Sequence, residues 1–395
     1  MTEYREKPSF KIVFWSCLFG CMLLRGQVNK DIIRVQYHIK TIAFYNLENL
    51  FDTINQPHVY DDDRTPTGKD QWTSKKFHHK INQLARVVGS LGLELSYEKV
   101  SANGQKRNQN ETRTPPRLKP LSYTSGADII GVCEVENIAV LEALVQHPIL
   151  QPFGYGIIHF DSPDERGIDV ALLYKKKGFI PASFNNHSLY LYNDMQMRDY
   201  TRDQLVVMGY LDGEPIWLII NHWPSRSGGE ARSKPHRLAA ALLNVRIIDS
   251  IRNLDPKAKI IGMGDFNDNP TDESFKQLLQ TKSRPSDSSY RALYNPMESL
   301  FKKGFGSLAY RDQWSLFDQF YLSETLLEKK EGVYSFLQAK IFTHPSLVTQ
   351  KGRYRGYPFR SYSGGSYQGG YSDHFPIQLF LIKKTLTATD SMESY

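Results

Sequence analysis

Short apolar runs rich in β-branched residues recur along the chain, and this feature constrains the fold more than any other. The runs are TIAFYN, DIIGVCE, YGIIHF, DVALLY, QLVVMGYL, IWLIINH, KIIGMGD, FDQFYLS and PIQLFLI. Their length and β-branching favour strands. Several runs are almost continuously apolar, which predicts strands that are buried on both faces.

Helical patterns lie between these runs. In residues 74–91 apolar side chains recur every three or four positions, and residues 232–251 carry a longer stripe of the same kind. With 395 residues the chain can bury a large core. Strands mixed with helices throughout predict an α/β fold in one large domain, residues 39–382, with sheets covered by helices.

The charge balance is mildly basic, with a formal net charge of +7. A polyanionic partner suits this bias, although many proteins without such a partner share it. Residues 96–120 are mostly basic with little apolar content, and they predict a flexible insertion. Residues 352–370 interleave arginine, tyrosine and glycine, which suits either contact with bases and phosphates or an ordinary glycine-rich surface loop. Residues 383–395 are predicted to form a polar tail.

The N-terminus predicts export. Arg5, Lys7 and Lys11 precede the run IVFWSCLFGCMLL, which is short for a membrane span and fits the core of a signal peptide. We expect cleavage after residue 26; an imperfect lipobox, LFGC, offers lipidation at Cys21 as the alternative. Either route predicts a periplasmic or extracellular protein with no transmembrane helix in the mature chain. Cleavage would leave Cys133 as a single cysteine, expected to be an inert core residue.

Polar side chains end or interrupt the apolar runs at six places that lie far apart in the sequence. They are Asn46 with Glu48, then Glu134, His222, Asp265 with Asn267, Asp318, and Asp373 with His374. Singly, each has an ordinary explanation as a turn former, a helix cap or a paired core residue. Together, carboxylates, amides and two histidines predict a hard-oxygen site for Mg²⁺, Mn²⁺ or Ca²⁺. The histidines can supply an acid and a base for the attack of water on a phosphate ester.

The order of these motifs resembles the endonuclease/exonuclease/phosphatase superfamily over residues 39–381. GDFND and SDHFP carry the likeness, together with YNLENLFD and GVCEVEN. NLENLFD, and QWT before the helix, are most similar to a secreted or surface-attached bacterial branch described as nuclease-like. The resemblance implies a DNase I-like four-layer α/β sandwich, in which two packed mixed β-sheets lie between helices and the site lies at one end.

The resemblance also implies a role for each site residue. Glu48 and Glu134 match the principal metal-binding carboxylates, and Asp373 a further one. The residues implied to act on the phosphate or the nucleophile are Asn46, Asp265, Asn267, His222 and His374, with Asp318 as the hydrogen-bond partner of His374.

Three further residues are candidates for supporting roles. Arg226 and Arg166 are candidate phosphate clamps, because guanidinium presents a planar fork to phosphate oxygens. Asp169 is a candidate to orient His222.

We therefore expect an exported, metal-dependent phosphodiesterase, with Mg²⁺ as the cofactor and DNA or RNA as the substrate of an endonuclease. The alternative is a phosphatase or phosphodiesterase for nucleotides, inositol phosphates or sphingomyelin. A non-catalytic binding protein is disfavoured, since the residues at the site positions are of the expected types. Which of His222 and His374 is the acid and which the base stays open. We expect a monomer with no stable protein partner.

Overall fold

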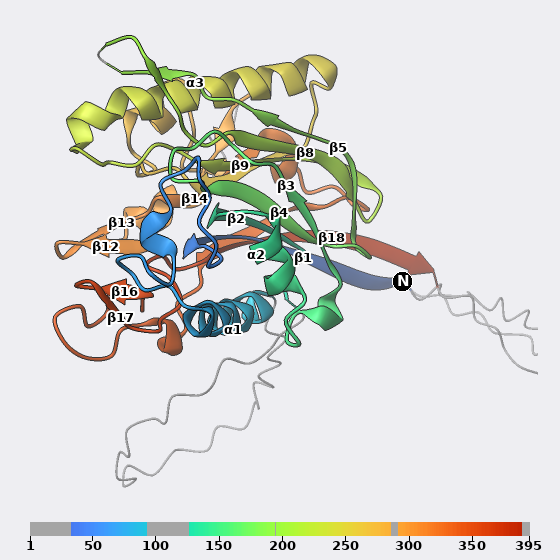
Figure 1. Ribbon diagram of the computed structural model, residues 1–395. Coiled ribbons are helices and arrows are strands. Elements are labelled where there is room, and N and C mark those ends of the chain that lie inside the picture. Colours follow the sequence, from blue (N-terminus) through green and yellow to red (C-terminus); the bar gives the residue numbers. More distant parts are fainter. Residues whose placement is uncertain (1–32, 93–125, 194, 286–290, 389–395) are drawn as a thin grey trace, which may run out of the picture.

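The computed structural model describes residues 33–92, 126–193, 195–285 and 291–388. Two six-stranded β-sheets lie face to face, and helices cover their outer faces (Figure 1). This four-layer α/β sandwich confirms the predicted fold class. The predicted signal peptide (residues 1–26), Cys21 and the basic insertion (residues 96–120) lie outside the described residues.

The two sheets are mixed. The first has the order β15-β18-β1-β2-β4-β3 and the second β11-β14-β10-β9-β8-β5. The first sheet consists of β1 (Ile33–Leu50), β2 (Ile129–Val135), β3 (Tyr155–His159), β4 (Asp169–Lys175), β15 (Ser335–Ile341) and β18 (Ile377–Ala388). The second consists of β5 (Phe179–His187), β8 (Gln204–Leu211), β9 (Glu214–His222), β10 (Ile260–Asp265), β11 (Leu293–Tyr294) and β14 (Asp318–Ser323). The pairs β1–β2 and β9–β10 are parallel.

Helices form the outer layers. α1 (Ser74–Ser90) and α2 (Ile138–Val145) cover the first sheet, and α3 (Glu230–Leu254) covers the second (Figure 1). Shorter elements are α4 (Glu298–Phe301), the π-helical turn η3 (Ser274–Leu278), and the 3₁₀ turns η1 (Asp62–Arg64), η2 (Gln151–Phe153), η5 (Glu324–Leu327) and η6 (Pro345–Leu347). Two-stranded pairs are β6 (Leu191–Tyr192) with β7 (Arg198–Asp199), β12 (Leu308–Tyr310) with β13 (Gln313–Ser315), and β16 (Tyr362–Ser363) with β17 (Ser366–Tyr367). Among the described residues, no helix combines the length and apolar character needed to cross a bilayer.

The alternation of side chains along β1 explains why residues 42–45 are apolar at every position. Ile42 and Phe44 point into the core between the two sheets, whereas Ala43 and Tyr45 point into the core beneath α1 and α2. Successive side chains of a strand face opposite sides of the sheet, so a strand in an inner layer buries both sets.

The first sheet extends beyond the predicted domain limits of 39 and 382. β1 begins at Ile33 and pairs with β18 as far as Ala388. The strand therefore continues through the first residues of the segment predicted to be a polar tail. The sequence did not predict this part of the strand, because Lys383, Lys384 and Thr385 are polar and interrupt the apolar run that indicates a buried strand. Residues 389–395 lie outside the described part of the chain.

Candidate active site

Asp265 is the last residue of β10, which lies between β9 and β14 in the second sheet. Asp265 pairs in register with His222 of β9 on one side and with Asp318 of β14 on the other. Gly264 permits this close approach, because a Cβ there would lie 2.4 Å from the carbonyl oxygen of Asn221. The register alone thus places an acid, a histidine and a second acid side by side.

The first sheet reaches the same centre through Asn46. Its Nδ2 donates to Asp265 Oδ2 and to Glu134 Oε1, both at 3.1 Å, and its Oδ1 accepts from the backbone nitrogen of Glu48 at 2.8 Å. Asn46 is fully buried. One amide therefore fixes the relative positions of two predicted site carboxylates, which come from different sheets, and of the backbone of Glu48.

His374 lies between two carboxylates. Its Nδ1 is 2.6 Å from Asp318 Oδ2, and its Nε2 is 3.8 Å from Asp265 Oδ2. Burial alone would lower the pKa of His374, but the charges of Asp318 and Asp265 raise it well above 6.5. Burial raises the pKa of Asp265 to about 7 against the opposing charge of His374. The arrangement favours a protonated imidazole that Asp318 holds in place.

His222 has the opposite electrostatic character. Its Nε2 is 3.9 Å from Asp265 Oδ2, and its buried Nδ1 has no hydrogen-bond partner among the described residues. Burial lowers its pKa well below 6.5, and the positive charges of Arg202 and Arg166 lower it further. His222 is thus held neutral, so the two histidines differ in protonation although both lie beside Asp265.

The backbone at this end of the sheets is unusual. Glu48 (φ 50°), Glu134 (φ 58°) and Asn267 (φ 51°) are in the left-handed region, which non-glycine residues seldom adopt. All three are predicted site residues. Such conformations cluster at functional sites, where the surrounding contacts hold them in place. Here the backbone nitrogen of Asn49 donates to Glu134 Oε2 at 2.8 Å, and that of Asn267 to Asp265 Oδ1 at 3.0 Å.

The predicted metal ligands Glu48, Glu134 and Asp373 fit a divalent cation by their chemistry, since they offer carboxylate oxygens; Glu48 is buried and the other two are partly buried. Burial and the charge of Glu48 raise the pKa of Asp373 to about 6, which reflects an accumulation of negative charge that a cation would relieve. Arg360 at present bridges two of them, with Nε 3.4 Å from Glu48 Oε1 and Nη2 2.8 Å from Asp373 Oδ2. In the described part of the chain, three groups of ligand atoms lie within 4.8 Å of one another, and none contains these three carboxylates.

Lys80 is a site residue that the sequence analysis missed. It belongs to α1, is completely buried, and its Nζ lies 3.6 Å from Glu48 Oε2. The same Nζ donates to Ser361 Oγ and to the carbonyl oxygen of Tyr371, both at 2.6 Å. Lys80 therefore fixes Glu48 and also both ends of the segment 361–371, which ends two residues before Asp373. Its signal in the sequence was a charged residue on the apolar face of a helix.

Replacement of Lys80 by methionine is expected to lower the free energy of unfolding by about 3–5 kcal/mol, because Glu48 would lose a buried partner. Urea denaturation of the metal-free protein measures this change. Lys75→Met, at an exposed position of the same helix, serves as the control and should stay within about 0.5 kcal/mol of wild type. Equal stability of the two variants would contradict a structural role for Lys80.

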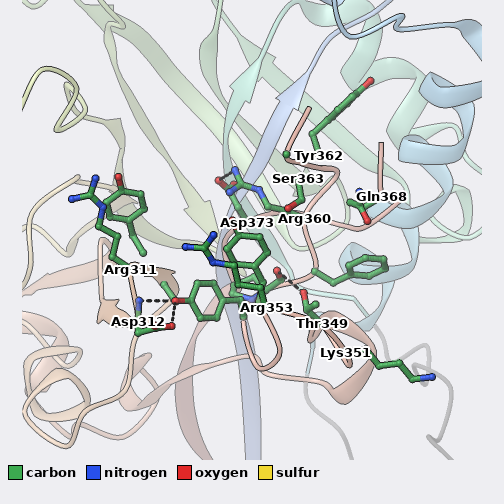
Figure 2. A pocket seen from close by; sticks show the side chains of 18 of the residues that line it. Arg311, Asp312, Thr349, Lys351, Arg353, Arg360, Tyr362, Ser363, Gln368 and Asp373 are labelled. Carbon is green, nitrogen blue, oxygen red and sulfur yellow. Dashed lines mark hydrogen bonds and ion pairs between the residues drawn. The ribbon is translucent and has the colours of Figure 1, made fainter. Parts of the chain in front are cut away.

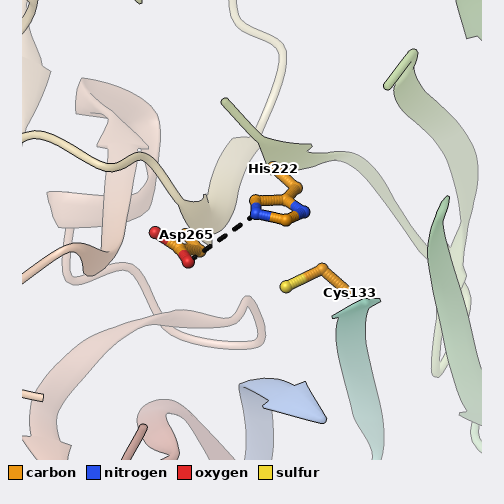
Figure 3. A group of neighbouring side chains, drawn as sticks. All are labelled: Cys133, His222 and Asp265. Carbon is orange, nitrogen blue, oxygen red and sulfur yellow. Dashed lines mark ion pairs between the residues drawn. The ribbon is translucent and has the colours of Figure 1, made fainter. Parts of the chain in front are cut away.

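Cys133 lies beside this centre without taking part in it. Its Sγ and ligand atoms of His222 and Asp265 are within 4.8 Å of one another (Figure 3). Burial raises the pKa of the thiol well above its ordinary value, and the charge of Asp265 raises it further. The thiol is therefore held protonated in the metal-free protein. Cys133 is a buried core residue, as the sequence predicted.

Asp169 does not orient His222, and this expectation is corrected. Its Oδ2 is 2.9 Å from Nε2 of His159, and its Oδ1 accepts from Ser162. The cause is the strand pairing, because β4 lies next to β3, which carries His159, whereas His222 belongs to the other sheet.

The two candidate phosphate clamps differ. Arg226 is engaged by carboxylates: its guanidinium contacts Glu230, Asp268 and Asp272 and lies over the ring of Phe317. Its Nε also donates to the backbone carbonyl oxygen of Asn267 at 2.8 Å, so Arg226 lies next to a predicted site residue while carboxylates balance its charge. Asp268, one of the carboxylates beside Arg226, also forms an ion pair with Arg237, so Asp268 has a structural role. Arg166 is half exposed, with its Nε 3.7 Å from Asp164 Oδ1, and its positive charge lowers the pKa of both Glu134 and His222.

Glu136 follows Glu134 by two residues and predicts a pH dependence of stability. Burial raises its pKa from 4.5 to about 8, despite hydrogen bonds from Asp52 and Gln56. Between these pH values the folded state binds a proton that the unfolded state releases, so stability falls as the pH rises. The melting temperature of the metal-free protein should therefore decrease from pH 5 to pH 8, and Glu136→Gln should flatten this slope. Glu142→Gln, on the exposed face of α2, should keep the wild-type slope; identical slopes for both variants would refute the assignment.

A two-sheet sandwich with carboxylates, amides and two histidines at the ends of its central strands defines a phosphoester hydrolase. The sequence matches the Endonuclease/Exonuclease/phosphatase family over residues 41–110 and 105–383, and the chain belongs to this family. The predicted resemblance is thereby confirmed. Members of this family generally use divalent cations, in agreement with the hard-oxygen donors of the site.

Solved structures with a similar fold have low sequence identity to this chain. A humanised TDP2 from D. rerio is 12% identical with a TM-score of 0.49, and the match covers 87% of this chain and 98% of that one. An endonuclease/exonuclease/phosphatase family protein from Bacteroides thetaiotaomicron is 14% identical with a TM-score of 0.48, over 92% and 99% of the two chains. A mannosyl-6-phosphatase from the same organism is 15% identical with a TM-score of 0.45, over 87% and 99%. No curated protein matches the sequence significantly.

Proposed function

We propose that this phosphoester hydrolase is an exported, magnesium-dependent endonuclease that cleaves the phosphodiester bonds of DNA or RNA. One observation supports an extended polyanionic substrate. Asp373 and Arg360 line a cavity of about 760 Å³, and a second cavity of about 430 Å³ is lined by Arg166 and by Pro224, which follows His222 by two residues. A substrate that occupies both cavities is larger than a small phosphate ester.

The basic residues of both cavities suit such a substrate. Arg311, Lys351, Arg353 and Arg360 line the larger cavity; Arg166, Arg202 and Arg232 line the smaller one. Positive charge along a path supplies affinity for a phosphate backbone whatever its sequence. The predicted export depends on residues 1–26 alone, which lie outside the described part of the chain.

The protonation states assign the two histidines in this proposal. Neutral His222 accepts the proton of the attacking water, and protonated His374 donates to the phosphate or the leaving oxygen. Asp318 positions His374 through a hydrogen bond. Asn46 positions Asp265 and Glu134 through hydrogen bonds to their carboxylates. A divalent cation held by Glu48, Glu134 and Asp373 would neutralise charge on the phosphate.

A panel of substrates tests the proposal. Supercoiled plasmid DNA, circular single-stranded DNA, RNA, bis(p-nitrophenyl) phosphate, p-nitrophenyl phosphate, inositol phosphates and sphingomyelin are each incubated with Mg²⁺, Mn²⁺ or Ca²⁺. Cleavage of a circular substrate, which has no ends, is the expected result and shows internal cutting. His374→Ala from the same purification controls for contaminating nuclease. Turnover of phosphomonoesters alone would refute the nuclease proposal while leaving the family assignment intact.

A further inference from the structure

The larger cavity is lined by tyrosine, arginine and lysine side chains that the hydrolysis of a phosphate ester does not itself require. Its walls come from residues 309–312 and 349–373, and its volume of about 760 Å³ lies within the usual range of ligand sites, about 300–1,000 Å³ (Figure 2). The β16–β17 hairpin contributes Tyr362, Ser363, Gly364 and Gly365 to the wall. Gly364 and Gly365 (φ 58° and 76°) form its tight turn, which needs left-handed backbone at both positions.

The hairpin rests on a rigid base. The rings of Tyr362 and Tyr367 lie 6.2 and 6.1 Å from that of Trp72, whose Nε1 donates to the carbonyl oxygen of Phe51. Lys80 holds Ser361 and the carbonyl of Tyr371 on either side of the hairpin. This wall of the cavity is therefore preformed, which lowers the entropic cost of binding a ligand there.

The cationic groups of the cavity are available to an anion. Arg311, Lys351 and Arg353 form no ion pair with any described residue. Instead, the guanidinium of Arg311 lies 5.2 Å from the ring centre of Tyr310, and that of Arg353 lies 5.8 Å from the ring centre of Tyr354. Each arginine is thus paired with an aromatic surface rather than with a carboxylate.

Aromatic rings connect this cavity with the reacting centre. Tyr310 is 67% exposed and Tyr354 is 44% exposed, so both rings are accessible. From Tyr354 the ring centres follow at 5.7 Å to Tyr357, 6.1 Å to Trp314 and 6.1 Å to Phe375. Phe375 directly follows His374 in the sequence. A ligand stacked at Tyr354 therefore lies at the end of a packed aromatic row that begins beside His374.

We propose that this cavity binds unpaired nucleotides of a single-stranded substrate next to the scissile phosphate; the inference rests on the proposed nuclease function. Exposed tyrosine rings bind bases by stacking, and free guanidinium groups bind the phosphates between them. In a duplex the base faces are covered by neighbouring pairs, so these rings favour unpaired bases. The preferred substrate is a single strand, or a strand end that has left its duplex.

Fluorescence anisotropy of the full chain in EDTA measures binding without cleavage. Three labelled oligonucleotides of about ten nucleotides are compared: a base-bearing single strand, an abasic strand with the same phosphates, and the duplex. Wild type should bind the base-bearing strand about tenfold more tightly than the abasic strand and more tightly than the duplex. Tyr354→Ala combined with Tyr310→Ala should remove this preference, whereas Tyr354→Phe, which keeps the ring, should retain it. Arg353→Ala should weaken binding to all three probes and reduce the salt dependence.

Tyr192→Ala, an exposed tyrosine on β6, serves as the matched control and should bind all probes as wild type does. Equal affinity of wild type for base-bearing and abasic strands, or a preference for the duplex, would overturn the proposal. Hydrolysis of bis(p-nitrophenyl) phosphate by wild type with Mg²⁺ or Mn²⁺ separates the two claims. If this small diester is hydrolysed without any base preference in binding, only the nucleotide site is refuted; if neither it nor a circular nucleic acid is hydrolysed, the proposed phosphodiesterase is refuted.

Discussion

Replacement of His374 by alanine is expected to lower kcat/KM for bis(p-nitrophenyl) phosphate by a factor of about 10³, with the fold intact. The imidazole that two carboxylates keep protonated would be lost, and with it the donor to the phosphate or the leaving oxygen. Initial rates at saturating Mg²⁺ or Mn²⁺ measure the effect, and a thermal melt shows whether the variant is folded. Near-wild-type turnover by a folded His374→Ala variant would refute the assignment of the site.

Two companion variants distinguish His374 from an ordinary surface histidine. His78→Ala, at an exposed position of α1, should keep wild-type kinetics. Asp318→Asn removes the charge that holds His374 protonated, and its Nδ1 contact at 2.6 Å would become a neutral one. The expected result is a smaller loss of rate than for His374→Ala, together with a shift of the pH–rate profile to lower pH.

Replacement of Glu134 by alanine is expected to abolish hydrolysis and to weaken binding of Mn²⁺ at least about a hundredfold. Loss of a residue that only hydrogen-bonds to a metal ligand lowers metal affinity up to about a hundredfold, and loss of a ligand itself should cost at least as much. Calorimetric titration with Mn²⁺ measures affinity independently of turnover. The loss has a second cause, because Asn46 Nδ2 and the backbone nitrogen of Asn49 would lose their acceptor. Glu134→Gln keeps an acceptor for these donors and removes only the charge.

The comparison of the two Glu134 variants therefore separates metal binding from structure. Glu142→Ala, on the exposed face of α2, controls for the loss of a carboxylate elsewhere. If Glu134→Gln bound Mn²⁺ as tightly as wild type, Glu134 would not be a metal ligand and its left-handed backbone would need another explanation.

The inner strands and the centre of the site could be predicted from the sequence because burial leaves a pattern. β1, β2, β9 and β10 are buried on both faces, and their polar ends interrupt otherwise apolar runs. β5 and β15 lie at sheet edges with mostly exposed or half-buried side chains, so they lack such a run and were not predicted. The same reason explains the missed extension of β18.

The partners of the site residues were less predictable, because they depend on strand order and loop contacts. Asp169 was assigned to the wrong histidine since nothing in its local sequence identifies β3 as the neighbour of β4. Arg360 could not be distinguished from the other arginines of its glycine-rich loop until its contacts with Glu48 and Asp373 were seen. Arg226 remains a candidate phosphate ligand, and its contacts with Asp268 and Asp272 could not be predicted from the sequence.

The pairing of β1 with β18 has a consequence for the biosynthesis of the protein. Ser372 Oγ donates to the carbonyl oxygen of Asn46 at 2.7 Å across 326 residues of sequence, and β18 follows directly after. A nascent chain that has just completed β17 contains Asn46, Glu48, Glu134 and Asp265 but lacks His374 and the strand that pairs with β1. The centre is therefore incomplete in any nascent chain that ends before His374.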